Sequence, residues 1–64
     1  MNYINANQLK EETGISYKEC LRIIRKAKEE MMKQGMYIPR TRPVLVKKEI
    51  VRKILEGKIW QDIN

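Results

Sequence analysis

The feature that most constrains the fold is the short segment Gly14-Ile15-Ser16, which lies between two stretches with helical patterns. Glycine accommodates the left-handed conformation that follows the last turn of a helix. Ser16, with Glu19 three residues later, forms a capping box that begins a new helix. The sequence therefore predicts one helix over about 6–13 and another over about 17–34. A helix, a three-residue turn and a second helix make the helix-turn-helix arrangement, although any helical hairpin needs a similar turn.

The pattern changes its period after the second helix. The runs 36–38 and 44–46 are short and rich in β-branched and aromatic residues, so they predict the two strands of a β-hairpin. A basic loop lies between them with a proline at each end, which favours an exposed tip or a splayed loop. A third helix is predicted over about 47–56. The predicted fold class is mainly α with a small β-hairpin, in a domain spanning 1–57 that is followed by a short apolar tail over 58–64.

The apolar positions of these elements predict a single small core, because 64 residues leave no room for a second one. Helical periodicity places a broad apolar face on the second helix and another on the third. The expected core residues are Leu9, Ile15, Cys20, Leu21, Ile24, Ala27, Met31, Ile38, Leu45, Ile50, Ile54 and Leu55. We expect a modest free energy of unfolding, about 3–5 kcal/mol.

Positive charge is the main functional signal. The chain carries 14 Lys and Arg residues against 8 Asp and Glu residues, a formal net charge of +6. In so short a chain this favours a polyanionic partner such as nucleic acid or an acidic protein surface. Four basic residues of the second helix, Lys18, Arg22, Arg25 and Lys26, fall within about 100° of arc opposite its apolar face. They form either a solvated helix face or a DNA-reading surface, on which the two arginines are suited to guanine or phosphate.

The residue types that most catalytic sites need are missing. The chain has no His and one Cys, so Ser-His-Asp sets, Cys-His sets and zinc sites of the usual kind are excluded. The carboxylates stand near Lys or Arg in helical segments and are expected to be solvated ion-pair partners. We therefore expect no enzymatic activity, no cofactor, no metal and no small-molecule substrate. The lone Cys20 and the lack of a long apolar run favour a cytoplasmic protein that does not enter a membrane.

The order of elements carries a resemblance over about residues 3–57. The succession INANQLKEETGISYKECLRIIRKAK, a short basic hairpin and VLVKKEIVRKILEG resembles the small winged helix-turn-helix proteins of the excisionase and MerR-like class, encoded beside integrases on bacterial mobile elements. In that class the second helix enters the major groove, and the hairpin wing touches phosphates or the minor groove. By position, the resemblance places Ser16, Tyr17, Lys18, Arg22, Arg25 and Lys26 on the recognition helix and Arg40, Thr41 and Arg42 on the wing. The class often has Pro at the start of the last helix, where this chain has Lys47.

The resemblance also implies a function and partners. It implies sequence-selective binding of double-stranded DNA, either as an excisionase (a recombination directionality factor) or as a small transcriptional regulator. An integrase or other recombinase and further copies of the chain on DNA are the implied protein partners. In the tail, Ile59, Trp60 and Ile63 either dock on the core or contact another protein. The alternative function is a protein-interaction module, such as a phage or plasmid inhibitor that binds an acidic host protein.

Overall fold

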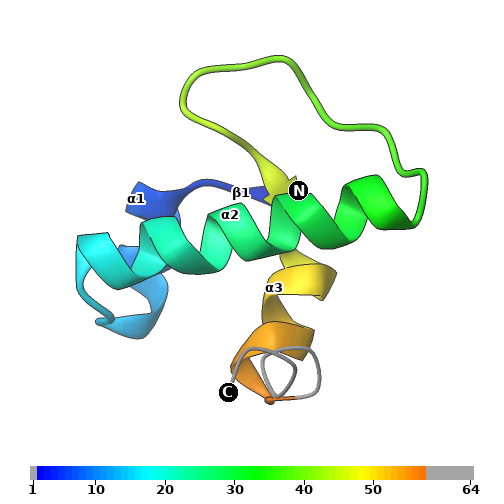
Figure 1. Cartoon of the computed structure of the whole chain (residues 1–64). Coiled ribbons are helices and arrows are strands. Elements are labelled where there is room, and N and C mark those ends of the chain that lie inside the picture. Colours follow the sequence, from blue (N-terminus) through cyan, green and yellow to red (C-terminus); the bar gives the residue numbers. More distant parts are fainter. Residues whose placement is uncertain (1, 58–64) are drawn as a thin grey trace.

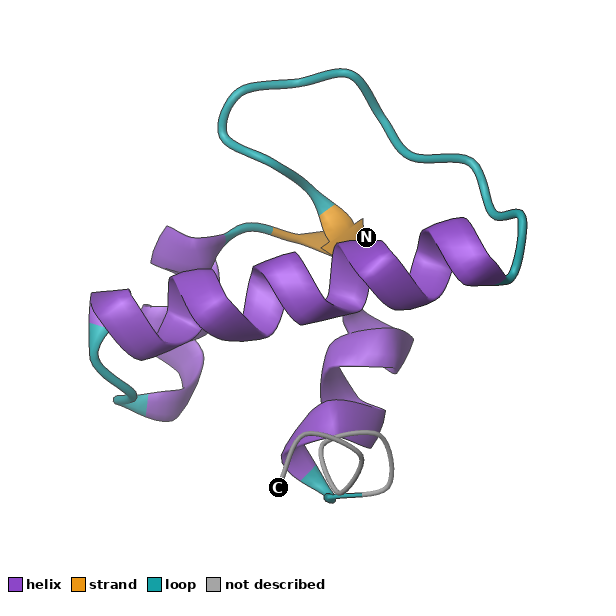
Figure 2. Cartoon of the chain, viewed as in Figure 1, coloured by secondary structure: helices purple, strands orange, loops and turns teal. Residues whose placement is uncertain are grey.

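The computed structural model of the chain describes residues 2–57, which form a small, mainly helical fold (Figure 1). The elements are β1 (Tyr3–Ile4), α1 (Ala6–Thr13), α2 (Tyr17–Lys33), β2 (Val46–Lys47) and α3 (Lys48–Leu55). Each helix boundary agrees with the predicted one to within one residue. Figure 2 shows the long loop, residues 34–45, which connects α2 to β2. None of the helices in residues 2–57 has the length and apolar character needed to cross a membrane.

Local hydrogen bonds close α1 at both ends. The Asn5 side chain accepts the Gln8 N–H at 2.9 Å, and the Gln8 side chain accepts the Asn5 N–H at 3.0 Å, which completes a capping box. At the other end Gly14 adopts a φ of 76°, the expected left-handed conformation. Its N–H donates to the Lys10 carbonyl at 2.8 Å. These bonds fix the point at which the chain turns toward α2.

The start of α2 forms one half of the capping box that the sequence predicts. The Ser16 hydroxyl accepts the Glu19 N–H at 3.3 Å. Instead of returning to the Ser16 N–H, the Glu19 carboxylate accepts from the Arg22 guanidinium at 3.0 Å. One side-chain cap is sufficient to begin the helix at Tyr17. The three-residue turn of the predicted helix-turn-helix is therefore present.

The small sheet joins the N-terminal segment to the segment before α3. β1 and β2 pair antiparallel, with Tyr3 opposite Lys47 and Ile4 opposite Val46. The Asn2 carbonyl accepts the Lys48 N–H at 2.8 Å. Because the Lys47 side chain makes no cap bond, the N-terminal segment supplies an acceptor that the start of α3 would otherwise lack.

The predicted hairpin differs from the observed sheet. The segments 36–38 and 44–45 have no strand structure and belong to the long loop. Pro39 and Pro43 have no amide hydrogen to donate, which weakens any ladder between these segments. Val46 instead pairs with Ile4, and the two side chains are 0% and 2% exposed. This pairing buries two large apolar side chains, which an exposed hairpin tip could not do.

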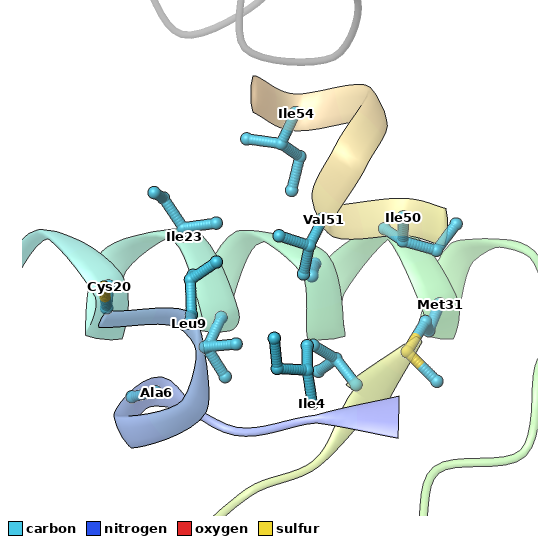
Figure 3. Close-up of a cluster of buried hydrophobic side chains, with 12 residues drawn as sticks. Ile4, Ala6, Leu9, Cys20, Ile23, Met31, Ile50, Val51 and Ile54 are labelled. Atoms are coloured by element: carbon cyan, nitrogen blue, oxygen red, sulfur yellow. The ribbon is translucent and has the colours of Figure 1, made fainter. Parts of the chain in front are cut away.

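One apolar cluster holds the elements together (Figure 3). Its buried residues are Ile4, Ala6, Leu9, Cys20, Ile23, Ile24, Ala27, Met31, Val46, Ile50, Val51 and Ile54. The pairing of β1 with β2 explains why Ile4 and Val46 belong to it although the sequence did not predict them. Ile15 and Ile38 are half-buried against the cluster.

Three predicted core leucines are not in this cluster. Leu21 and Leu55 are 39% and 45% exposed, and Leu45 is half-buried. Leu21 lies on the side of α2 that faces the long loop, together with Val44. The prediction was wrong for Leu21, because this side of α2 faces the loop and is not covered by α1 or α3, so its side chain stays 39% exposed.

Candidate nucleic-acid interface

The long loop and α3 lie on different sides of α2 (Figure 1). The loop arches along one side of the helix, and the residues of α2 beside it form the loop flank: Tyr17, Leu21, Arg25, Lys28 and Met32. The residues on the side where α3 packs form the α3 flank: Glu19, Ile23, Lys26 and Glu30. Spacings of three and four residues place each set along one face of the helix. The two flanks are separated by an outer face that carries Lys18, Arg22 and Glu29.

Lys26 does not lie on the exposed basic face that the sequence predicts. Its side chain is 12% exposed, and its Nζ is 3.6 Å from the Glu30 carboxylate, which is itself 16% exposed. The same carboxylate lies 3.6 Å from the Lys33 Nζ. Lys26 is therefore turned toward the α3 flank, and its charge is shared with a neighbouring acid. The expected group of four outward cations is reduced to Lys18, Arg22 and Arg25, all of them exposed.

Arg22 keeps an exposed position but has a local partner. Its Nη1 lies 3.0 Å from Oε1 of Glu19, and the two side chains are 58% and 47% exposed. A surface ion pair of this kind contributes only about 0.2–1 kcal/mol, so an incoming anion can replace the carboxylate at small cost. Arg22 thus remains compatible with a contact to phosphate or a base.

The loop flank and the long loop enclose a cavity system that we call the basic hollow. It consists of one pocket of about 790 Å³ over the C-terminal half of α2 and one of about 500 Å³ nearer its start. Both pockets include Lys28, Arg42 and Val44, so they lie side by side. Arg25 lines the second pocket and Arg40 the first. No Asp or Glu of residues 2–57 lines either pocket.

The cations of the basic hollow differ from Arg22, Lys26 and Lys33 of α2, each of which lies near a carboxylate. Arg25, Lys28, Arg40 and Arg42 form no ion pair within the described part of the chain. Arg25 and Lys28 come from two successive turns of α2, and Arg40 and Arg42 come from the loop. The fold therefore places four uncompensated positive charges around one open surface, where their fields add.

The remaining predicted site residues have varied positions. The Ser16 hydroxyl is used as the cap of α2, and the Thr41 hydroxyl donates to the Pro43 carbonyl at 3.1 Å. Tyr17 is 43% exposed and lines the basic hollow. The Ser16 and Thr41 hydroxyl groups therefore make hydrogen bonds to the neighbouring backbone. The tail residues Ile59, Trp60 and Ile63 lie outside the described residues.

Lys28 was not among the predicted site residues. The prediction took the arc directly opposite the apolar face, whereas the loop lies to one side of that arc. Lys28 follows Arg25 by three residues and precedes Met32 by four, so the same helical spacing would have grouped it with them. Its helical spacing from Arg25 was therefore the one local signal for Lys28, and the sequence did not indicate on which side of α2 the loop lies.

The other reactive groups of residues 2–57 do not form a site. Cys20 is fully buried, its Sγ donates to the Ile15 carbonyl at 3.5 Å, and burial raises the pKa of the thiol, which keeps it protonated and unreactive. No three His, Cys, Asp or Glu side chains in this part of the chain are grouped so as to hold a metal ion.

Comparisons with known proteins found no match: no family model, curated protein or solved structure matches the chain. The function must therefore be argued from the charges, contacts and exposure of its own residues.

Proposed function

We propose that the chain binds double-stranded DNA as a small winged helix-turn-helix protein, with α2 as the recognition helix and the long loop as the wing. The N-terminal turns of α2 enter the major groove, because residues in the first turns of such a helix reach base edges. The loop lies over the neighbouring phosphates or the adjoining minor groove.

The observation that carries this proposal is the set of unpaired cations around the basic hollow. Arg25 and Lys28 on α2 and Arg40 and Arg42 on the loop have no acidic neighbour in either pocket. Phosphate contacts supply most of the affinity of DNA-binding proteins. An array of cations without local partners binds phosphate without first giving up an ion pair.

The exposed cations have different roles in this proposal. Lys18 and Arg25 lie in the first half of α2 and are exposed, so they are positioned for contacts at the floor or the edge of the major groove. A guanidinium can bind guanine O6 and N7 with two hydrogen bonds, so Arg25 supplies selectivity. Arg40 and Arg42 supply affinity, and they favour a narrow minor groove because its negative potential is stronger.

The proposal is tested by the salt dependence of duplex binding. With Lys18, Lys28, Arg40 and Arg42 each neutralising one phosphate, log K falls against log salt concentration with a slope of about −3 to −4. Fluorescence anisotropy of a labelled duplex between 50 and 200 mM salt, roughly the range over which such slopes are measured, gives this value. The variant Lys28→Gln should lower the magnitude of the slope by about one. Duplex affinity that does not change with salt contradicts the proposal.

The finer role that we propose is that of an excisionase or a small transcriptional regulator of a mobile element. Both roles use the same DNA-binding surface, and the excisionase role adds contacts to an integrase and to further copies of the chain along DNA. A nuclease footprint inside the attachment site of an integrase supports the excisionase role. A footprint that covers a promoter supports the regulator.

A further inference from the structure

Apolar side chains that solvent reaches are concentrated at the basic hollow. Residues 2–57 contain six large hydrophobic side chains that are exposed. Five of them line the hollow, namely Tyr17, Leu21, Met32, Tyr37 and Val44, and the sixth, Leu55, lies on α3. Met32 and Tyr37 are 63% and 74% exposed. Exposed apolar residues that gather at one place with a polar rim are typical of a binding site for another protein.

Binding to DNA does not account for the whole set of these apolar residues. Phosphates need charge and hydrogen-bond donors, and the cations already described supply both. Met32 lies at the far end of α2 from the turns proposed to enter the major groove. A partner that covers Leu21 and Met32 must therefore present apolar groups of its own over the length of α2.

The hollow also constrains the charge and the length of its partner. The four cations that line it have no carboxylate beside them, so the complementary partner is acidic. From Tyr17 to Met32 the loop flank spans about 22 Å at 1.5 Å per residue, which equals four turns of a helix. An amphipathic helix of that length presents apolar residues at positions i, i+4, i+8 and i+11, with acidic residues at its edges.

We propose that the basic hollow binds an acidic amphipathic helix of a partner protein. The apolar residues of this helix pack on Leu21, Met32 and Val44, and its carboxylates pair with Arg25, Arg42 and their neighbours. This binding mode does not require DNA binding. A second consequence rests on the proposed function: because Arg25 and Arg42 also contact DNA there, the acidic helix and the duplex compete for the protein.

The test uses the full chain and a synthetic fluorescent peptide of about sixteen residues, four helical turns, with Leu on one face and Glu on the other. A peptide of the same composition in scrambled order serves as the control, since it keeps the charge but lacks the apolar face. Anisotropy should show that the amphipathic peptide binds at least about tenfold more tightly than the scrambled one. Equal affinity of the two peptides would mean attraction by charge alone and would overturn the proposal.

Two variants locate the site. The double variant Leu21→Gln/Met32→Gln should weaken peptide binding about tenfold. Met32→Gln alone, at the far end of α2 from the turns proposed to enter the major groove, should weaken peptide binding while its duplex affinity stays within about twofold. The matched control Leu55→Gln, which changes the exposed leucine of α3, should alter neither affinity. Unchanged peptide binding in the double variant overturns the proposal.

Two further outcomes would also overturn it. An equal loss of duplex affinity in Met32→Gln assigns the apolar residues of the hollow to the DNA interface. A dimer of the unmodified chain by light scattering, lost in the same double variant, assigns the hollow to a second copy. If the protein does not bind the duplex but binds the peptide, the proposed function and the competition between helix and duplex are rejected. The proposed binding of an acidic helix is then still supported by the peptide result.

Discussion

The two flanks of α2 both carry charged residues, but the fold uses these charges differently. On the α3 flank, Glu19 pairs with Arg22 at 3.0 Å, and Lys26 pairs with Glu30 at 3.6 Å. On the loop flank, neither Arg25 nor Lys28 forms an ion pair within residues 2–57. Opposite charges held close together cancel each other's field at a distance, whereas unpaired charges attract a polyanion. Arg25 and Lys28 can therefore meet an anion without first leaving a local partner.

The apolar residues of the two flanks differ in the same way. Ile23 on the α3 flank is 8% exposed and belongs to the core, while Leu21 on the loop flank is 39% exposed. Both are large aliphatic side chains of one helix, two residues apart. The α3 flank therefore packs into the core, while the loop flank exposes apolar side chains to solvent.

The largest expected effect tests this division directly. Ile23→Ala removes three buried carbon atoms and leaves a cavity, so we expect the free energy of unfolding to fall by about 2–3 kcal/mol. Leu21→Ala removes the same number of carbon atoms from a site that solvent reaches, and we expect a loss below about 1 kcal/mol. Urea unfolding followed by circular dichroism measures both. Equal losses would contradict the distinction between a packed flank and an open one.

The next effect concerns DNA. The double variant Arg25→Gln/Arg42→Gln removes one unpaired cation from α2 and one from the loop, and we expect the duplex dissociation constant to rise about 100-fold. The control Arg52→Gln/Lys53→Gln also removes two charges, from +6 to +4 by subtraction, but from α3. We expect less than about a fivefold rise for the control, because only the general field is weakened. Anisotropy at one fixed salt concentration compares the two variants.

One outcome of that comparison would contradict the prediction. If the α3 variant loses as much affinity as the loop-flank variant, net charge alone governs binding and the basic hollow is not the interface. Thermal unfolding of both proteins checks that neither loss of affinity arises from loss of the fold.

The helices and the turn between α1 and α2 could be predicted because their signals are local. Asn5, Gly14 and Ser16 act within three or four residues of their own positions, and the structure places each of them as a cap. Helical periodicity likewise identified Ile24, Ala27 and Met31 as core residues, and all three are buried. Such features depend on short segments of chain, so the sequence alone was sufficient.

The sheet could not be predicted in the same way, because its partner is distant in the sequence. Val46 pairs with Ile4, about forty residues away, and not with the nearer run 36–38.

The candidate site depended on this result. The loop lies along α2 beside Lys28. Lys26 lies on the side of α2 that faces α3, where it pairs with Glu30. Of the predicted cations of α2, Lys18 and Arg25 form no ion pair within residues 2–57, while Lys26 is paired. Lys28 takes its place beside the loop.

The smallest expected change in stability concerns the ion pairs of the α3 flank. Glu30→Gln removes the carboxylate that lies 3.6 Å from both Lys26 and Lys33. We expect the free energy of unfolding to fall by about 0.5–1 kcal/mol, because Lys26 and Glu30 are mostly covered and the lysine loses its partner. Added salt should reduce the difference from the parent protein, since part of the interaction is screened. Duplex affinity should stay within about twofold of the parent, because the paired charges of this flank are not part of the proposed interface.

Glu29→Gln is the matched control for that variant. Glu29 is the adjacent residue, is exposed, and forms no ion pair within residues 2–57. The substitution changes the net charge by the same amount, so a difference in stability between the two variants measures the pairing and not the charge. Equal stability of Glu29→Gln and Glu30→Gln in urea would show that the Lys26 pair contributes nothing measurable. Lys26 would then be a cation that phosphate could recruit, and the two flanks of α2 would be less distinct in solution than their contacts indicate.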